Sequence, residues 1–289
     1  MSRIEVHNVS FTYASGTSYE KKALDGVSLA FEEGIVTGLI GHTGSGKSTL
    51  VQLLNGLIKP DEGEVILDGE NIWAKPKEIR KVRFKVGLVM QYPEHQLFDE
   101  TVRSDISYGP RNMGLSEEEI AAAVDDAVRF IGLDEGLLDK SPFDLSGGQK
   151  RRAALCGVIA MRPGVLILDE PAAGLDPGGR REILGRIRDF SRTSKTKVII
   201  VSHSMEDMAI YCDSVAVLAH GALSFEGTTA EVFSRAEELI SLGLDVPAIN
   251  RVASALASRG IDIGRDVYTV KYAFKKLMER AGKAAEDEA

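Results

Sequence analysis

The segment Gly41-His-Thr-Gly-Ser-Gly-Lys47-Ser48-Thr49 decides the fold of this 289-residue chain. It matches the pattern G-x-x-x-x-G-K-[ST], in which glycines let successive backbone N–H groups converge on phosphate oxygens. The apolar stretch 34–40 predicts a buried strand before the loop, and residues 48–57 predict a helix after it, whose positive end favours anions. A structural glycine turn is the alternative, and the strand–loop–helix context favours the phosphate site over it.

We therefore expect this loop to bind the phosphates of ATP. The Lys47 ammonium would contact the β- and γ-phosphates, and the Ser48 hydroxyl would be a ligand of Mg²⁺. The residues expected to bind nucleotide form one continuous run, namely Gly41, His42, Thr43, Gly44, Ser45, Gly46, Lys47, Ser48 and Thr49.

A second motif, Val165-Leu-Ile-Leu-Asp169-Glu170, consists of four apolar residues followed by two acids. The carboxyl end of a central strand is where ligands sit in open parallel sheets. Asp169 would hold Mg²⁺ through water, and Glu170 would direct a water molecule at the γ-phosphate. An acidic pair is more often a helix cap or a solvated turn, but the phosphate loop upstream favours the functional interpretation.

The order of predicted elements indicates an α/β protein. Residues 1 to about 90 show short strands and turns, and residues from about 98 to 160 show mostly helical patterns. After residue 164, strands and helices alternate, which is typical of a parallel sheet with helices on its faces. Ile249, Val252 and Leu256 share one face of a predicted helix near the C-terminus.

Val270, Phe274, Leu277 and Met278 share a face of a second such helix. We therefore expect a main domain over residues 1–240 and a C-terminal helical extension over residues 241–289. The apolar faces of the extension suit either a packed lid on the main domain or a contact between subunits, and the sequence does not decide between them.

The chain resembles ABC ATPases through Leu145-Ser-Gly-Gly-Gln149, which is the signature motif of that family. A small hydroxyl, two glycines and an amide at a helix start offer donors to a phosphate. The resemblance implies a P-loop NTPase of the ABC type, with a RecA-like core, an antiparallel β subdomain and an α-helical subdomain. It also implies that two ATPs lie between two such domains. The signature residues that would contact the partner's nucleotide are Ser146, Gly147, Gly148 and Gln149.

The same resemblance implies further roles. Tyr13 is similar to an aromatic residue that stacks on adenine, although a core or edge-strand tyrosine is the alternative. Gln91 is similar to a glutamine that reaches Mg²⁺ and water, Asp176 to a residue that communicates between the two sites, and His203 to a histidine that contacts the γ-phosphate. The expected catalytic residues are thus Lys47, Gln91, Glu170 and His203, and the expected metal ligands are Ser48, Gln91 and Asp169.

Two positions depart from the family pattern. Similar proteins often have threonine where Ala172 and Ser202 stand in this chain. Neither change removes a catalytic group, so we expect hydrolysis to be retained.

Within that family, the segments 11–24, 41–49 and 91–98 are similar to the second of two ATPase types in energy-coupling-factor importers. This resemblance implies ATP- and Mg²⁺-dependent uptake of vitamins or transition-metal ions. The implied partners are a second ATPase subunit, identical or different, a transmembrane coupling subunit and a substrate-binding membrane subunit. The implied location is the cytoplasmic face of the cell membrane, with residues 92–100 as the docking surface. The acids of that surface could meet arginines of the coupling subunit, with simple solvation as the alternative, and they are Glu94, Asp99 and Glu100.

The alternatives are an ATPase of another ABC importer and an ABC ATPase without a transport role. Many non-transport members carry long coiled coils, zinc-binding cysteines or two ATPase domains, and this chain has none of these patterns. Its cysteines, Cys156 and Cys212, have no metal-ligand spacing around them. The net charge of −8 argues against a nucleic-acid partner. No apolar run approaches the roughly 20 residues that span a bilayer.

Overall fold

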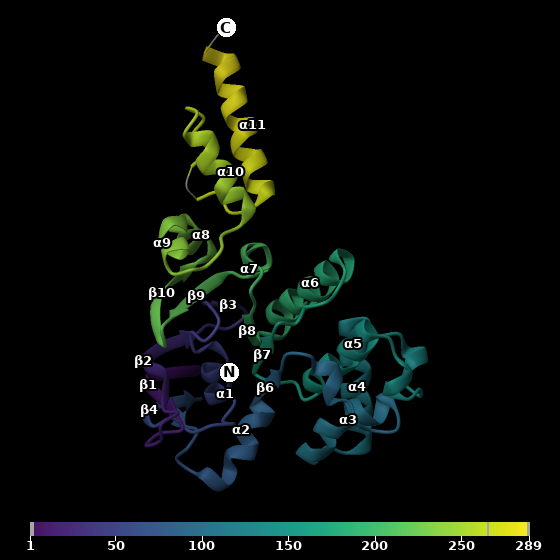
Figure 1. Cartoon of the computed structure of the whole chain (residues 1–289). Coiled ribbons are helices and arrows are strands. Elements are labelled where there is room, and N and C mark those ends of the chain that lie inside the picture. The colour runs from purple at the N-terminus through teal and green to yellow at the C-terminus, as the bar shows by residue number, and fades with distance from the viewer. Residues whose placement is uncertain (1–2, 265, 288–289) are drawn as a thin grey trace.

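Two sheets organise the chain, as the computed structural model in Figure 1 shows. The structure describes residues 3–264 and 266–287, with side chains through residue 280. The first sheet is antiparallel, with the order β2-β1-β4-β5. Its strands are β1 (Ile4–Tyr13), β2 (Lys21–Phe31), β4 (Glu62–Leu67) and β5 (Glu70–Asn71). The Asp68-Gly69 turn between β4 and β5 has positive φ at both residues, as a tight hairpin requires.

The second sheet carries the predicted motifs, and its order is β10-β9-β3-β8-β7-β6. Its strands are β3 (Val36–Ile40), β6 (Val86–Val89), β7 (Val165–Asp169), β8 (Lys197–Val201), β9 (Ser214–Ala219) and β10 (Ala222–Thr228). Neighbouring strands from β9 to β6 are parallel, and only β10 runs antiparallel to its neighbour. The predicted parallel sheet is confirmed. The segments that follow β3, β8, β7 and β6 therefore leave the sheet at one edge.

The alternating side chains of the parallel strands divide the core in two. Along β7, Leu166 and Leu168 join the cluster beneath the helical part of the chain, whereas Ile167 joins the cluster beneath the antiparallel sheet. Strands buried on both faces read as continuous apolar runs, which explains the sequence pattern of β3, β7 and β8. Helix α1 (Lys47–Leu54) belongs to the second cluster, and α6 (Pro177–Ser194) and α7 (Met205–Tyr211) belong to the first.

Three helices form a separate group beside the sheet in Figure 1. They are α3 (Val102–Met113), α4 (Glu117–Ile131) and α5 (Gly147–Ile159). The predicted capping box at the start of α4 is present, because Ser116 accepts from the backbone of Glu119 and the Glu119 carboxylate accepts from the backbone of Ser116. The short α2 (Ile79–Lys85) lies before β6, and single 3₁₀ turns cover Pro76–Glu78, Pro93–Gln96, Glu135–Leu137 and Pro142–Asp144.

The chain ends in four helices, α8 (Thr229–Ser234), α9 (Ala236–Ser241), α10 (Ala248–Ala257) and α11 (Val270–Asp287). Both helices predicted for the C-terminal extension are thus present, and α11 projects away from the sheets (Figure 1). Of the face shared by Ile249, Val252 and Leu256, Val252 is exposed while the other two pack near Ala253. Within the described residues, no helix combines the length and the apolar character needed to cross a membrane. The domain boundary at residue 240 stays a prediction.

Element boundaries differ from the sequence predictions by a few residues. The helix predicted over 48–57 ends at Leu54 because Gly56 adopts a positive φ of 68°. The strand predicted from Gly34 begins at Val36, since Gly34 also has positive φ, at 65°. Both glycines end or delay a regular element because they reach the left-handed region at little cost.

Candidate nucleotide-binding site

The predicted phosphate loop connects β3 to α1, and its glycines are sterically required. Gly46 has φ 104°, and a Cβ there would lie 2.6 Å from the Ala23 carbonyl oxygen. A Cβ on Gly41 would lie 2.4 Å from both the Leu218 carbonyl oxygen and the Ser45 hydroxyl. The backbone therefore packs closely against β2 and β9, which leaves the loop N–H groups at the start of α1 as an anion site.

The Lys47 side chain is buried and folds back over this loop. Its Nζ donates to the carbonyl oxygens of Gly41 at 2.5 Å and of His42 at 3.1 Å. Burial lowers the pKa of the Lys47 ammonium, and the charges of Asp169 and Glu170 oppose that shift. The ammonium is thus held above the loop and within electrostatic range of both acids, where a phosphate would also place negative charge.

A pocket of about 140 Å³ opens beside the loop. Its lining comprises Tyr13, Lys21, Ala23, Gly44, Gly46, Lys47, Ser48 and Thr49. The Tyr13 hydroxyl lies 3.2 Å from the Thr49 hydroxyl, and 41% of Tyr13 is exposed. Tyr13 is therefore not a core residue, so the structure removes one alternative interpretation of it.

The acidic pair lies where β7 ends, two strands from β3 and beside β8. Glu170 has a left-handed φ of 51°, and its N–H donates to the Val201 carbonyl at the end of β8. The backbone N–H of His203 donates to Glu170 Oε1 at 2.7 Å, and the Ser202 hydroxyl donates to Oε2 at 3.1 Å. These bonds fix the orientation of the Glu170 carboxylate.

Asp169 lies one residue earlier, at the end of the same strand. Burial raises the pKa of its carboxyl group, and the neighbouring Glu170 charge adds to that shift. Lys47 and His203 act in the opposite direction. A bound divalent cation would favour the ionised form in the same way.

The donor chemistry at this edge fits magnesium. The Ser48 hydroxyl and the Asp169 carboxylate are hard oxygen donors, and Mg²⁺ is usually held by one or two such groups together with substrate phosphates and water. Across the described part of the chain, no group of three or more His, Cys, Asp or Glu side chains could hold an ion without a substrate. These two oxygen donors therefore suit a magnesium ion that binds together with a nucleotide.

Gln91 and His203 follow β6 and β8, the strands on either side of β7, and both side chains are exposed. The structure thus brings Lys47, Asp169, Glu170 and His203 to one edge of the sheet. Gln91 follows β6, the strand next to β7.

The signature residues lie elsewhere, at the start of α5. Ser146 and Gln149 form a capping box with each other. In the described residues, no hydrogen bond or ion pair joins residues 146–149 to the phosphate loop. Asp176 likewise caps α6, and hydrogen bonds from the backbone of Gly179 and Gly178 lower the pKa of its carboxyl group. The predicted residues therefore form two separate groups within one chain.

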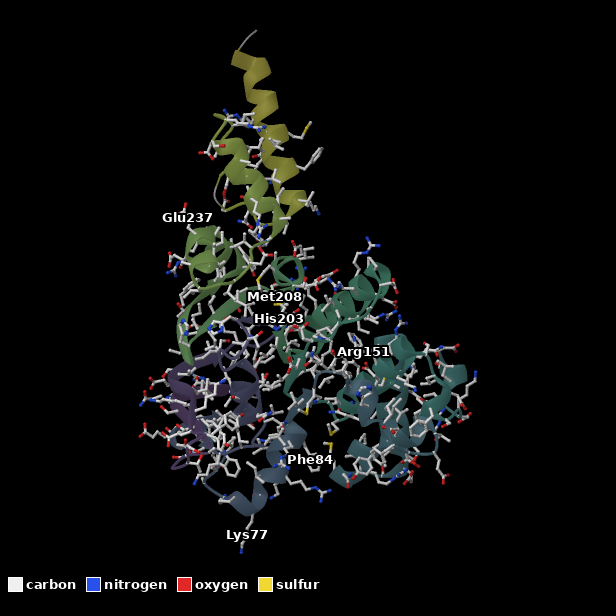
Figure 2. The ribbon with its side chains drawn as sticks, viewed as in Figure 1. Lys77, Phe84, Arg151, His203, Met208 and Glu237 are labelled. Atoms are coloured by element: carbon white, nitrogen blue, oxygen red, sulfur yellow. The ribbon has the colours of Figure 1, made fainter. Side chains whose placement is uncertain are left out.

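An ion pair that the sequence did not reveal joins two of the predicted motifs. Arg151, on the signature helix α5 and labelled in Figure 2, forms this pair. Its guanidinium lies 3.0 Å from the Glu94 carboxylate and also donates to the Ala173 carbonyl. The Arg151 side chain is 5% exposed and that of Glu94 17%. The expectation that Glu94 faces a partner's arginines is therefore wrong, because this carboxylate is already paired within the chain.

Ser202 is the second residue whose importance was missed. The sequence showed it only as a departure from a threonine pattern, yet its hydroxyl contacts the carboxylate of Glu170. The retained hydroxyl in a Thr-to-Ser change was the signal that could have identified this contact.

Comparison with known proteins identifies the family. The profile described as ABC transporter matches residues 24–173. The chain belongs to the ABC transporter family. The sequence prediction of an ABC-type ATPase fold is confirmed, and with it an enzyme that binds and hydrolyses ATP.

Similar proteins narrow the family further. The chain is 48% identical over 276 residues to "Energy-coupling factor transporter ATP-binding protein EcfA2" of Clostridium acetobutylicum, covering 95% of this chain and 96% of that protein. It is 52% identical over 262 residues to the protein of the same name from Symbiobacterium thermophilum, covering 91% of each.

Solved structures agree. cbiO1 from Clostridium perfringens, described as part of the ABC transporter complex cbiONQ, is 39% identical with a TM-score of 0.73, over 83% of this chain and 93% of that one. The ATP-binding cassette MJ0796, solved as a dimer bound to ADP and Pi, is 26% identical with a TM-score of 0.71. The match covers 78% of this chain and 98% of that one. The predicted resemblance to energy-coupling-factor ATPases is confirmed.

Proposed function

We propose that this chain is the ATP-hydrolysing subunit of an energy-coupling-factor importer for vitamins or transition-metal ions. The observation that carries the proposal is the arrangement at the sheet edge, where a buried lysine above a phosphate loop lies within electrostatic range of Asp169 and of Glu170, whose carboxylate is oriented by two hydrogen bonds. The names of the relatives, which are energy-coupling-factor transporter ATP-binding proteins, support the choice of transporter.

In this proposal the loop N–H groups and Lys47 hold the triphosphate, and Tyr13 stacks on the adenine. Ser48, Asp169 and Gln91 hold Mg²⁺, which neutralises phosphate charge when bound. Glu170 orients the attacking water in line with the γ-phosphorus, and its two hydrogen bonds keep the carboxylate aimed.

His203 would contact the γ-phosphate from the end of β8. The signature residues 146–149 and Asp176 would serve the site of a second ATPase subunit. Their separation from the phosphate loop supports this, because in the described part of the chain no hydrogen bond or ion pair links residues 146–149 to that loop.

The C-terminal helices are the proposed second contact between ATPase subunits. Val270, Phe274 and Met278 on α11 are 73%, 66% and 57% exposed. A helix that packed as a lid would bury this face, so their exposure supports the intersubunit alternative. Apolar side chains at this spacing form one stripe along a helix.

The membrane partners would dock near residues 92–100 on the cytoplasmic face of the cell membrane. Tyr92 and Phe98 are exposed there, and Phe98 packs edge-on against the exposed Tyr108 of α3 at 5.0 Å. Asp99 and Glu100 stay candidates for contacts with basic side chains of the coupling subunit. A transmembrane coupling subunit and a substrate-binding membrane subunit complete the proposed complex.

The test is the variant Glu170→Gln, which keeps the size of the side chain and one acceptor oxygen but cannot accept a proton as a carboxylate does. We expect it to bind ATP with Mg²⁺ as tightly as the parent protein and to lose phosphate release. The matched control is Glu237→Gln, an exposed residue on α9. Brisk hydrolysis by Glu170→Gln, in the presence of the second ATPase subunit, would remove Glu170 from the proposed role.

A further inference from the structure

One segment of the chain is strongly basic, although the whole protein carries a net charge of −8. Residues 75–85, which form the 3₁₀ turn before α2 and α2 itself, contain six basic residues and one acid. We call residues 75–85 the basic segment. Its basic side chains are all exposed, and they are Lys75, Lys77, Arg80, Lys81, Arg83 and Lys85.

Most of this charge is not neutralised within the chain. Among the described residues, Lys81 and Lys85 form ion pairs, with Glu78 at 2.9 Å and Asp68 at 2.7 Å. The charge of Lys81, and to a smaller extent that of Lys75, lowers the pKa of the Glu78 carboxyl group. In residues 3–264 and 266–287, the ammonium groups of Lys75 and Lys77 make no hydrogen bond or ion pair.

The two arginines of the segment bond to neutral oxygens. Arg80 donates to the amide oxygen of Asn112 at 2.8 Å, and Arg83 donates to the Gly56 carbonyl at 3.1 Å. These bonds place the guanidinium groups but leave their positive charges without a counter-ion.

The arginines of α6 show what a purely structural cluster looks like in this protein. Three of its five arginines have a carboxylate partner: Arg180 and Arg192 each pair with an aspartate outside the helix, at 3.4 and 3.3 Å, and Arg186 pairs with Glu182 at 3.1 Å. In the described residues, two of the six basic side chains of the basic segment form such an ion pair, so a smaller share of its positive charge is matched and the rest is available to an external partner.

The segment is held rigidly at one end of the molecule. Ile79 and Val82 pack against the core beneath the antiparallel sheet. Lys77, in the 3₁₀ turn, projects from the end of the molecule opposite α11, and Phe84 lies on the α2 helix that follows (Figure 2). The Phe84 ring is half-buried and lies beneath the Arg80 guanidinium, at 5.6 Å. An extended surface could therefore meet the lysines without obstruction.

The chemistry favours a charged surface over a discrete anion. A hollow of about 170 Å³ beside the segment is lined by the carboxylates Glu70 and Glu78 as well as by lysines. A single phosphate would meet those acids there, whereas headgroups spread over a plane would meet the lysine tips first. Lysine is a flexible point charge that suits such diffuse contacts, and anionic leaflets attract basic segments that lie within a Debye length.

We infer that the basic segment rests on anionic phospholipid headgroups and orients the ATPase against the membrane. The inference rests on the proposed function, which brings the chain to the cytoplasmic leaflet. The hydrogen bond from Arg80 to Asn112 ties α2 to the end of α3, the helix that carries Tyr108 beside the proposed docking surface. Lipid contact there would set the angle at which that surface meets its partner.

The experiment is co-sedimentation of the purified full chain with vesicles of phosphatidylcholine, alone or mixed with phosphatidylglycerol. We expect binding only to the anionic vesicles, with loss at high salt. The double variant Lys75→Gln/Lys77→Gln should bind roughly 30-fold more weakly, since each basic side chain near an anionic surface contributes a comparable increment. Both lysines are exposed and form no ion pair or hydrogen bond with any described residue, so folding should be unaffected.

The matched control is Lys140→Gln/Lys195→Gln, which removes the same charge from two exposed lysines outside the basic segment. Equal binding to neutral and anionic vesicles, or an equal loss in the control, would overturn the inference. It would also be overturned if the chain ignored all vesicles while the Lys75/Lys77 variant failed to assemble with the membrane subunits, because the partner would then be a protein. ATP hydrolysis measured on the same samples tests the proposed function separately.

Discussion

Replacing Ser202 with alanine should slow ATP hydrolysis without weakening ATP binding. The Ser202 hydroxyl donates to Glu170 Oε2 at 3.1 Å and accepts from the Ser204 backbone N–H, also at 3.1 Å. The Ser202→Ala variant removes both bonds, while the His203 N–H still holds the other carboxylate oxygen at 2.7 Å. Glu170 therefore keeps its place but gains freedom to rotate away from the water that it must orient.

The size of the effect follows from the bond that is lost. A hydrogen bond to a charged group contributes about 1.5–3 kcal/mol, and about 1.4 kcal/mol corresponds to tenfold in rate. Because the hydrogen bond from His203 persists, we use the lower end of that energy range and expect kcat to fall about tenfold. Since Ser202 lies behind Glu170 and not in the loop, the ATP dissociation constant should change by less than about twofold.

The assay is steady-state phosphate release together with a direct ATP titration. Ser202→Thr retains the hydroxyl and should recover most of the rate. The control is Ser107→Ala, another buried serine, whose hydroxyl donates to the Arg103 carbonyl on α3. A Ser202→Ala variant with the kcat of the parent protein would refute the claim that this hydroxyl positions Glu170.

Three further predictions concern the loop, the buried ion pair and the C-terminal face. Gly46→Ala, at φ 104°, should abolish ATP binding and lower Tm, measured by titration and calorimetry; parent-like binding would contradict the close packing. Arg151→Met and Glu94→Gln should each lower the free energy of unfolding by about 3–5 kcal/mol, because each leaves a buried charge without its partner. In urea unfolding, the double variant should lose less stability than the two single variants added together. Phe274→Asp should weaken association of ATPase subunits in sedimentation, whereas Tyr19→Asp, on an exposed loop, should not.

The sequence predicted the nucleotide edge well because its signals are local. The loop 41–49 and the apolar run ending at Asp169 each combine a strand with the groups that follow it, so the motif and its position come together. Parallel pairing of β3, β8 and β7 then brings these ends to one edge without further information.

Contacts between distant parts of the chain were beyond such reasoning. Glu94 and Arg151 are 57 positions apart, and neither periodicity nor spacing links them. Exposure of Phe274 was equally hidden, because an amphipathic helix has the same pattern whether its apolar face meets its own domain or another subunit. The left-handed φ of Glu170 could not be predicted from the sequence either, since nothing about a glutamate residue requires that conformation.

The two groups of site residues favour a shared catalytic centre on physical grounds. At the sheet edge, Lys47 and the loop provide for phosphate charge, but the only acid oriented by two hydrogen bonds there is Glu170 among the residues discussed. The start of α5 offers backbone donors that would stabilise charge on a transferring phosphate, yet in the described residues no hydrogen bond or ion pair joins residues 146–149 to the phosphate loop or to Glu170. Each group lacks what the other supplies, so a second subunit, placing its α5 against this loop, would complete both sites at once.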